Sequence, residues 1–374
     1  MISKRAARLR PSGIRKMFER AAQMPDPLDF SIGQPHFEVP APVADAAVDA
    51  IRRGDNRYTV TEGLPELNAK IAAHHKARIG HAPERTMVTG GVSGGLTLAY
   101  LAMLDPGDEL LLPDPYFPVY RELAEVLGIE VSHYDLYPDF RLRREALEAA
   151  VSPRSKVLLL NAPANPTGAV YTADELRMAA DFAEEHGLAI ISDEIYDGFV
   201  FDGPLPSVAT IAPNSLVLGG FSKTYGVPGW RLGWAAGPDE CIAAMTKLQM
   251  FTFVCGNVPA QHAAIAALDL DLSHLRDEFR QKRDRLMQAL ADPYGPVEPG
   301  GAFYLFPPAP AGTTGTEFVE RALNHKMLMV PGAAFSRRDT HFRLSYAVHD
   351  DVLEKGIEVL LRMTRGKTAT GPAS

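Results

Sequence analysis

A lysine in a glycine-rich turn is the residue of this chain whose setting best suits covalent chemistry. Lys223 lies in the run Leu218-Gly-Gly-Phe-Ser-Lys-Thr-Tyr-Gly-Val-Pro-Gly-Trp-Arg-Leu-Gly233. The residues before it, Ser215–Leu218, indicate a short buried strand, and Arg231 follows a few residues later. A lysine just beyond a buried strand, with an arginine close behind it, suits covalent capture of an aldehyde that carries a phosphate.

Two other interpretations of Lys223 compete with this one. A lysine in a glycine-rich turn is usually a solvated surface charge, and the stretch alone leaves that alternative open. A nucleotide-binding P-loop has the pattern GxxxxGK and would require glycine at the positions of Val217 and Ser222. The P-loop is therefore excluded.

A second candidate is the glycine-rich run Thr89-Gly-Gly-Val-Ser-Gly-Gly-Leu96, which follows an apolar strand and begins a helix. A turn of this kind directs backbone N–H groups and the positive end of the helix dipole at a phosphate. The run does not spell GxGxxG, which argues against a dinucleotide site. A tight turn without a ligand stays an alternative for this stretch alone.

An acidic residue closes the apolar strand Leu188–Asp193. Burial of a carboxylate is unfavourable unless the carboxylate has a partner. A pyridinium nitrogen is a suitable partner for Asp193, because an aspartate held there keeps the ring nitrogen protonated. The ring can then accept electrons from a substrate carbanion.

Three further side chains are placed where they could contribute to a ligand site. Each also has an ordinary structural interpretation. Phe117 follows the strand Glu109–Leu112 and can stack on a ring or simply pack in the core. Asn165 lies in an Asn-Pro-Thr-Gly run that could be only a turn. Arg343 lies within the alternating strand His341–Tyr346, where an arginine is more often a surface residue.

Together these motifs resemble a known family. Gly220-Phe-Ser-Lys223, with the glycines of the following turn and Arg231-Leu-Gly233, is similar to the pyridoxal-phosphate lysine signature of class I and II aminotransferases. These enzymes belong to the fold type I, or aspartate aminotransferase, superfamily. The matching motifs run from Ser31 to Arg343 in the order that the family shows. The resemblance implies a transferase that uses pyridoxal 5′-phosphate, an amino acid and a 2-oxo acid.

The resemblance also assigns the phosphate contacts. It implies that Val92 and Ser93 bind the phosphate through their backbone, with Ser222 and Arg231 beside it. Tyr58 corresponds to the tyrosine that reaches the phosphate of the neighbouring subunit. A homodimer with the active site at its interface is therefore expected.

The remaining roles follow from the same resemblance. Lys223 holds the cofactor as a Schiff base, Phe117 stacks on the ring and Asp193 pairs with the ring nitrogen. Tyr196 and Asn165 hydrogen-bond the 3′-oxygen of the ring. The resemblance also implies three residues that bind the substrate: Gly33, Asn165 and Arg343.

Arg343 corresponds to the arginine that binds the substrate α-carboxylate through a bidentate pair, a geometry that lysine does not reproduce. Lys223, once displaced by the substrate, is expected to move the proton between Cα and C4′ of the cofactor. Release of the 2-oxo acid and reloading by a second one give ping-pong kinetics. Catalysis is thus assigned to three residues: Lys223, Asp193 and Tyr196.

The chain departs from the family pattern at two positions, and two other functions compete with transamination. The family usually has serine at the position of Gly220, so one phosphate contact is expected to be missing or replaced. One branch of the aspartate aminotransferases has lysine at the position of Ser93, so aspartate specificity is not supported. A β-lyase or cyclising lyase of the same fold is the main alternative function. A non-catalytic regulator would need a DNA-binding module, for which the chain has neither extra length nor a basic segment.

Composition limits the classes of function. The chain has 374 residues and a formal net charge of −8, which argues against nucleic acid as a main partner. No apolar run has the length of a membrane span, and no apolar region follows the basic N-terminus, so neither a membrane segment nor a signal peptide is expected. Two cysteines, Cys241 and Cys255, indicate a reducing compartment, and we expect the cytoplasm. No ligand spacing predicts a metal site.

Short apolar runs alternate with helical patterns through most of the chain. This alternation predicts an α/β fold whose large domain has a mainly parallel, seven-stranded sheet covered by helices. A smaller α+β domain is expected from both chain ends. The expected division is residues 1–42 for the N-terminal arm and part of the small domain, 43–285 for the large cofactor-binding domain and 286–374 for the small domain. Ligands of such sheets bind beyond the carboxyl ends of the strands.

Overall fold

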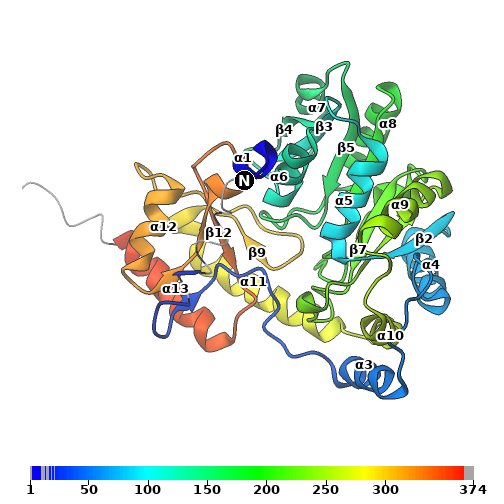
Figure 1. The fold of residues 1–374 in the computed structure, drawn as a ribbon. Coiled ribbons are helices and arrows are strands. Elements are labelled where there is room, and N and C mark those ends of the chain that lie inside the picture. The colour runs from blue at the N-terminus through cyan, green and yellow to red at the C-terminus, as the bar shows by residue number, and fades with distance from the viewer. Residues whose placement is uncertain (1, 10–12, 14–16, 18, 21, 366–374) are drawn as a thin grey trace, which may run out of the picture.

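The computed structural model describes residues 2–9, 13, 17, 19–20 and 22–365. A large α/β unit and a smaller α+β unit lie side by side, and the long helix α11 (Ser273–Tyr294) runs between them (Figure 1). A short helix, α1 (Lys4–Arg8), lies close to α6 (Pro118–Leu127) of the large unit.

The large unit is built on one seven-stranded sheet with the order β2-β8-β7-β6-β5-β3-β4. Only β8 runs against its neighbours β2 and β7, while the other neighbouring pairs are parallel. The predicted mainly parallel sheet is therefore confirmed. The strands are β2 (Arg85–Thr89), β3 (Glu109–Asp114), β4 (Glu130–Asp135), β5 (Ser155–Asn161), β6 (Ala189–Asp193), β7 (Leu216–Gly220) and β8 (Gly233–Gly237).

Helices cover both faces of this sheet, which explains the nearly continuous apolar runs in its strands. In β3, Leu110 and Leu112 pack into one core cluster and Leu111 into the cluster on the opposite face. The first face is covered by α5 (Gly91–Met103), α6 and α9 (Asp239–Thr252). The second face is covered by α7 (Arg144–Ala150), α8 (Ala173–Glu185), α3 (Ala41–Arg53), α4 (Pro65–Ile79) and α10 (Val258–Ala267).

The smaller unit joins both ends of the chain, as predicted. β1 (Leu28–Asp29) pairs in parallel with β10 (Met327–Leu328). β12 (Phe342–Ser345) lies between β11 (Val330–Pro331) and β9 (Tyr304–Leu305) in an antiparallel sheet. The helices α12 (Gly315–Leu323) and α13 (Asp350–Arg365) complete the unit.

Three elements of the smaller unit escaped prediction, namely β1, β9 and α12. β1 and β9 contain two residues each, which is too short for an alternating pattern to be visible. The start of α12 carries a capping box between Thr314 and Glu317, a signal that does identify a helix N-terminus. Side chains of α11 from Leu275 to Tyr294 already pack into the core of the smaller unit. The division at residues 42 and 285 stays a prediction.

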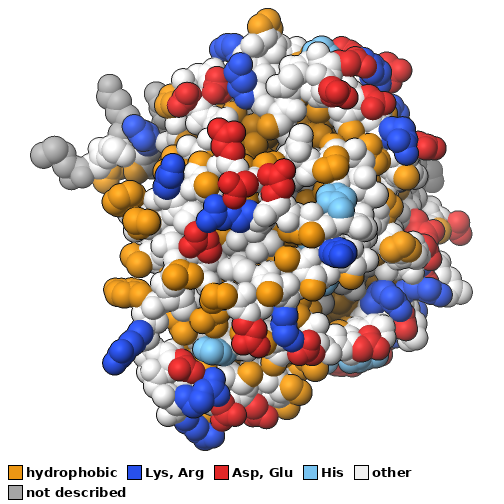
Figure 2. Space-filling model, turned by 90° about the vertical axis from the view of Figure 1, so that its right-hand side faces the viewer, with side chains coloured by type: hydrophobic (Ala, Val, Ile, Leu, Met, Phe, Trp, Pro, Cys, Tyr) orange, Lys and Arg blue, Asp and Glu red, His pale blue; other side chains and the backbone are white. Residues whose placement is uncertain are grey.

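Acidic, basic and hydrophobic side chains are intermixed on the face of the molecule that Figure 2 shows, and no large area carries one sign of charge. Among the described residues, no helix combines the length and the apolar character that crossing a bilayer requires.

Candidate active site

A cavity of about 260 Å³ lies at the edge of the sheet where β2, β3, β5, β6 and β7 end. The carboxyl ends of parallel strands meet at one edge, so segments far apart in sequence converge there. Arg343 and Tyr304 of the smaller unit and the N-terminal segment at Gly33 close the cavity. Every predicted site residue except Tyr58 lines it: Gly33, Val92, Ser93, Phe117, Asn165, Asp193, Tyr196, Ser222, Lys223, Arg231 and Arg343.

Lys223 projects into this cavity from the turn after β7. Its Nζ donates a hydrogen bond to the Gly33 carbonyl oxygen at 2.7 Å. Burial, together with the charges of Arg343 and Arg231, lowers the pKa of Lys223 to about 8. A substantial fraction of the amine is therefore neutral near physiological pH, as a nucleophile requires.

The end of the cavity near α5 is suited to an anion. Gly91 begins α5 with φ +73°, and a Cβ added to it would lie 2.7 Å from Arg231 Nη2. Glycine thus lets the guanidinium lie against the first turn of the helix, where Val92 and Ser93 line the cavity with Ser222 nearby. Arg231 is held by a hydrogen bond from Nη1 to the Pro228 carbonyl at 3.0 Å. A cation beside a helix N-terminus is a favourable phosphate site.

Asp193 ends β6 with its side chain 3% exposed. Burial raises the pKa of this carboxyl to about 6, although hydrogen bonds from Tyr120 and from the Ile195 backbone act in the opposite direction. The Tyr120 hydroxyl donates to Oδ2 at 2.8 Å, and the Ile195 N–H donates to Oδ1 at 3.1 Å. The carboxylate is oriented and still favours a cationic partner in the cavity.

Tyr120 was not predicted as a site residue, although it is 1% exposed and touches Asp193 directly. It lies on α6 three residues after Phe117, which is also in the cavity wall. A lone aromatic residue on a helix resembles any core residue, so the sequence offered no signal for its contact with Asp193.

Arg343 is a buried cation, 1% exposed, in the middle of β12. Nη1 donates to Asn165 Oδ1 at 2.9 Å and Nη2 to the Ser31 carbonyl oxygen at 2.7 Å. The rings of Tyr304 and Phe335 lie 4.5 and 4.6 Å from the guanidinium carbon.

All of these partners of Arg343 are neutral, and Nε has no hydrogen-bond partner among the described residues. Burial lowers the pKa of the guanidinium, because the charged form has lost water without gaining an anion. The arrangement fits a carboxylate ligand, which would supply the missing charge.

Tyr196 and Tyr304 form a pair in the cavity wall, with their hydroxyl oxygens 2.7 Å apart. Tyr304 was not predicted, although it lies in the Gly-Gly-Ala-Phe-Tyr run that ends at this position. A Cβ added to Gly33 would lie 2.5 Å from the Tyr304 hydroxyl oxygen. Glycine at position 33 therefore leaves the space that the tyrosine occupies.

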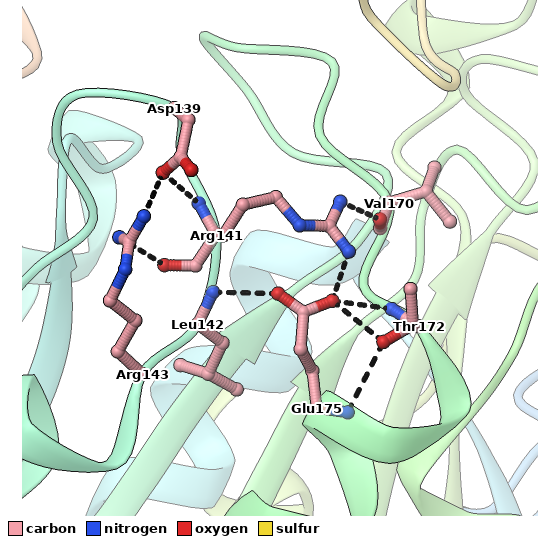
Figure 3. Close-up of polar contacts among 7 residues, drawn as sticks. All are labelled: Asp139, Arg141, Leu142, Arg143, Val170, Thr172 and Glu175. Carbon is pink, nitrogen blue, oxygen red and sulfur yellow. Dashed lines mark hydrogen bonds and ion pairs between the residues drawn. The ribbon is translucent and has the colours of Figure 1, made fainter.

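The loop that carries Asn165 is held at both ends. Near its start, Asn161 Oδ1 accepts a hydrogen bond from the Asn165 N–H at 2.9 Å. At its far end, Figure 3 shows the Glu175 carboxylate between Arg141, Leu142 and Thr172. Glu175 caps α8 together with Thr172 and also accepts the Leu142 N–H at 2.8 Å. The loop is thereby fixed to the segment before α7.

Two positions named in the sequence analysis, Tyr58 and Gly220, do not line the cavity. Tyr58 is 82% exposed in the segment between α3 and α4, so its expected contact with a neighbouring subunit stays a prediction. A Cβ added to Gly220 would lie 3.1 Å from both Gly233 Cα and Ile195 Cδ1. A serine there would require these neighbours to move by a few tenths of an ångström.

The donor set of the cavity fits one kind of cofactor. Lys223 can bind an aldehyde, the first turn of α5 with Arg231 can bind a phosphate, and Asp193 can pair with a protonated ring nitrogen. Arg343 remains for the carboxylate of a substrate.

Comparison with known proteins agrees with this geometry. The family model described as aminotransferase class I and II matches residues 25–360. The probable aspartate aminotransferase of Methanocaldococcus jannaschii is 33% identical over 372 residues, which cover 96% of this chain and 99% of that protein. The aromatic-amino-acid aminotransferase 2 of Thermococcus litoralis is 33% identical over 385 residues, which cover 98% of this chain and 99% of that protein.

A solved structure shows the same fold. The aspartate aminotransferase from Thermus thermophilus with maleate is 32% identical and superposes with a TM-score of 0.92, covering 97% of this chain and 99% of that one. The family match includes every residue that lines the cavity, from Gly33 to Arg343. The chain therefore belongs to the class I and II aminotransferases.

Proposed function

We propose that this aminotransferase binds pyridoxal 5′-phosphate through Lys223 and transfers an amino group from an amino acid to a 2-oxo acid by a ping-pong mechanism. One observation carries the proposal: Lys223 shares a single cavity with Asp193, Arg231 and Arg343. When bound, the cofactor supplies an electron-accepting ring that stabilises negative charge at the substrate Cα.

The large unit holds the cofactor in this proposal. Arg231, Ser222 and the backbone N–H groups of Val92 and Ser93 bind the phosphate. Asp193 pairs in its ionised form with the protonated ring nitrogen.

The ring is oriented by three further side chains, Phe117, Asn165 and Tyr196. Phe117 would stack on its face, while Tyr196 and Asn165 would donate hydrogen bonds to its 3′-oxygen. Because Asn165 Oδ1 accepts from Arg343, its NH₂ group is the part of the amide that can donate.

Lys223 has two successive tasks. Its neutral amine would hold the cofactor through a covalent link and would be released when an amino acid substrate takes its place. The free amine would then act as general base and general acid and move the proton between the substrate Cα and C4′ of the cofactor. A pKa of about 8 suits both directions, since the protonated and the neutral amine are both accessible at neutral pH.

Arg343 binds the α-carboxylate of each substrate, with Gly33 and Asn165 beside it. Relatives named for aspartate and for aromatic amino acids are about equally similar to this chain. Both donor classes therefore belong in the first substrate panel. Ser93 stands where one branch of the aspartate enzymes has lysine, so we rank the neutral and aromatic donors first.

We also propose a homodimer, in the cytoplasm. Tyr58 is 82% and Phe251 86% exposed, and Val60 and Phe253 are exposed as well. Gln249, near the end of α9, donates a hydrogen bond to the Thr61 carbonyl at 2.7 Å, which brings the two segments together. Apolar groups of this kind on one surface are typical of a subunit contact. Tyr58 would then reach the phosphate of the neighbouring subunit.

The test is a half-reaction with the purified protein. Pyridoxal 5′-phosphate is added, the visible absorbance of the lysine-bound cofactor is recorded, and borohydride reduction followed by peptide mass spectrometry identifies the modified lysine. We expect Lys223 to be modified, and each good amino donor to bleach the absorbance and release its 2-oxo acid without an acceptor. Lys76→Ala, an exposed lysine on α4, is the control for Lys223→Ala.

Two results would overturn the proposal. The first is the absence of a lysine-bound cofactor, or its attachment to another lysine. The second is the release of ammonia and pyruvate from a cysteine-type substrate without any 2-oxo acid acceptor, which would assign the lyase reaction instead.

A further inference from the structure

The residues that follow Asp193 and Tyr196 contact α4 rather than the cavity. Glu194 Oε2 lies 2.5 Å from Arg78 Nη2, and Asp197 Oδ2 lies 3.9 Å from Arg78 Nε. The side chains of Glu194 and Arg78 are 2% and 11% exposed. A buried ion pair thus lies directly behind the carboxylate assigned to the cofactor ring.

Glu194 joins several elements at this point. Its Oε1 accepts hydrogen bonds from the hydroxyls of Ser192, at 2.9 Å, and Ser207, at 2.6 Å. Its backbone N–H donates to the Leu218 carbonyl of β7 at 2.9 Å. Ser207 caps the short helix η1 (Val208–Thr210), so one carboxylate ties the end of β6 to η1 and, through Arg78, to α4.

The charge of Arg78 matters as well as its contacts. Burial alone would lower the pKa of Arg78, but the charges of Glu194 and Asp197 outweigh burial and raise it. The Glu194 charge also acts on Asp193, whose ionisation it opposes. Removing the arginine would leave an unneutralised carboxylate next to the one that must be ionised to hold the ring nitrogen.

We propose that Arg78 is a positioning residue for transamination: through Glu194 and Asp197 it fixes the segment that carries Asp193 and Tyr196, and it neutralises the charge behind Asp193. The proposal rests on the cofactor role of Asp193 given above. Arg78 itself does not line the active-site cavity.

Two opposite substitutions test the electrostatic part. Arg78→Met leaves the Glu194 charge unbalanced, so Asp193 should ionise only at higher pH. Glu194→Gln removes that charge and should let Asp193 ionise at lower pH. The readout is the dissociation constant of pyridoxal 5′-phosphate as a function of pH, since the cofactor requires ionised Asp193.

The pH at which affinity falls should therefore move in opposite directions in the two variants, and it should return toward the wild-type value in Arg78→Met/Glu194→Gln. The other titratable groups around Asp193 are Tyr100, Tyr120, Tyr196 and Lys223, and none of them is changed.

Chemical rescue tests the positioning part. Arg78 and Asp197 line a second cavity of about 330 Å³, through which a small cation can reach the space left by Arg78→Ala. We expect kcat of this variant to fall roughly 10- to 100-fold, as for other residues that orient a ligand group. Millimolar guanidinium should restore part of the loss, while equal concentrations of sodium should not. Arg144→Met, which breaks an exposed arginine–glutamate pair on α7, is the matched control.

Failure of the inference is distinct from failure of the proposed function. If wild type forms no lysine-bound cofactor, the proposed function is wrong. Suppose instead that wild type forms the lysine-bound cofactor, but that cofactor affinity falls at the same pH in the Arg78 and Glu194 variants as in wild type. In that case the inference alone is overturned. Should Arg78→Met not fold, Glu194→Gln and the double variant still decide the electrostatic part, because neither leaves a buried unpaired carboxylate at position 194.

Discussion

Arg343 in β12 and Arg78 in α4 are both largely withdrawn from water, yet they have opposite surroundings. Arg343 contacts an amide oxygen, a backbone carbonyl and two aromatic rings, all neutral. Arg78 contacts two carboxylates, those of Glu194 and Asp197. Burial lowers the pKa of Arg343, whereas for Arg78 the neighbouring carboxylates more than compensate for burial and its pKa is raised.

The difference separates a binding charge from a structural one. A buried cation with carboxylate partners is balanced within the protein, so its removal exposes the partner to the full desolvation penalty. A buried cation with only neutral partners is incomplete until an anion arrives. In the proposals above, Arg78 is of the first kind and stabilises the site, and Arg343 is of the second kind and binds the substrate.

The stability of the cofactor-free protein should show the largest difference between the two arginines. Arg78→Met leaves Glu194 buried without a counter-ion and should lower the free energy of unfolding by about 3–5 kcal/mol. Arg343→Met leaves only two neutral acceptors without donors and should lower it by about 1–2 kcal/mol. Denaturant unfolding of both variants measures the difference, and equal losses would contradict it.

The buried amine of Lys223 should likewise make the stability of the cofactor-free protein depend on pH. Its pKa is about 8 in the folded protein and 10.5 in the unfolded chain, so between these values the unfolded chain binds more protons. Stability of the cofactor-free protein should therefore rise with pH across this window, by about 3 kcal/mol attributable to this group. The cost of burying the charged amine is fully present below pH 8. Lys223→Met should lack the rise, and an identical pH dependence in both proteins would refute the assignment.

Substrate affinity sharpens the role of Arg343. Arg343→Lys keeps a charge but loses the bidentate geometry, and we expect KM for the amino donor to rise by about 30- to 150-fold, equivalent to 2–3 kcal/mol. The dissociation constant of the cofactor should change little, because Arg343 belongs to the substrate side of the cavity. Steady-state kinetics and cofactor titration separate the two effects. A loss confined to cofactor binding would be inconsistent with this role.

The smallest effect is expected for Tyr120, which contacts Asp193. Tyr120→Phe removes the hydrogen bond to Asp193 Oδ2 and should weaken cofactor binding about fivefold, equivalent to roughly 1 kcal/mol. Tyr134→Phe is the control, since this buried hydroxyl donates to the Leu159 carbonyl at 2.8 Å and does not line the cavity. If both variants bind the cofactor as wild type does, Tyr120 has no part in orienting Asp193.

Local patterns in the sequence were sufficient for the seven strands and most helices of the large unit. The apolar runs of β3 and β5 are long and bounded by polar turns, so their type and place are visible without tertiary information. The two-residue strand β9 carries no such pattern. β9 forms a strand because it pairs with the neighbouring strand β12 through backbone hydrogen bonds.

The chemical groups of the site were likewise visible, because each lies in a motif directly before or after a strand of the large sheet, or within β12. Lys223, Asp193 and Arg343 could be singled out from their motifs, and the resemblance to the family supplied their expected roles. Their contacts could not. Tyr304 covers Arg343, Tyr120 orients Asp193, and Arg78 balances the carboxylate behind it, each across more than 30 positions of sequence.

The physical reason is that a motif records which group the chemistry needs, whereas orientation and charge balance depend on distant side chains that only folding brings together. A tyrosine on a helix or an arginine at a helix end has no local feature that marks it. Whether a buried charge lies beside carboxylates, like that of Arg78, or beside neutral groups alone, like that of Arg343, is decided by the tertiary structure.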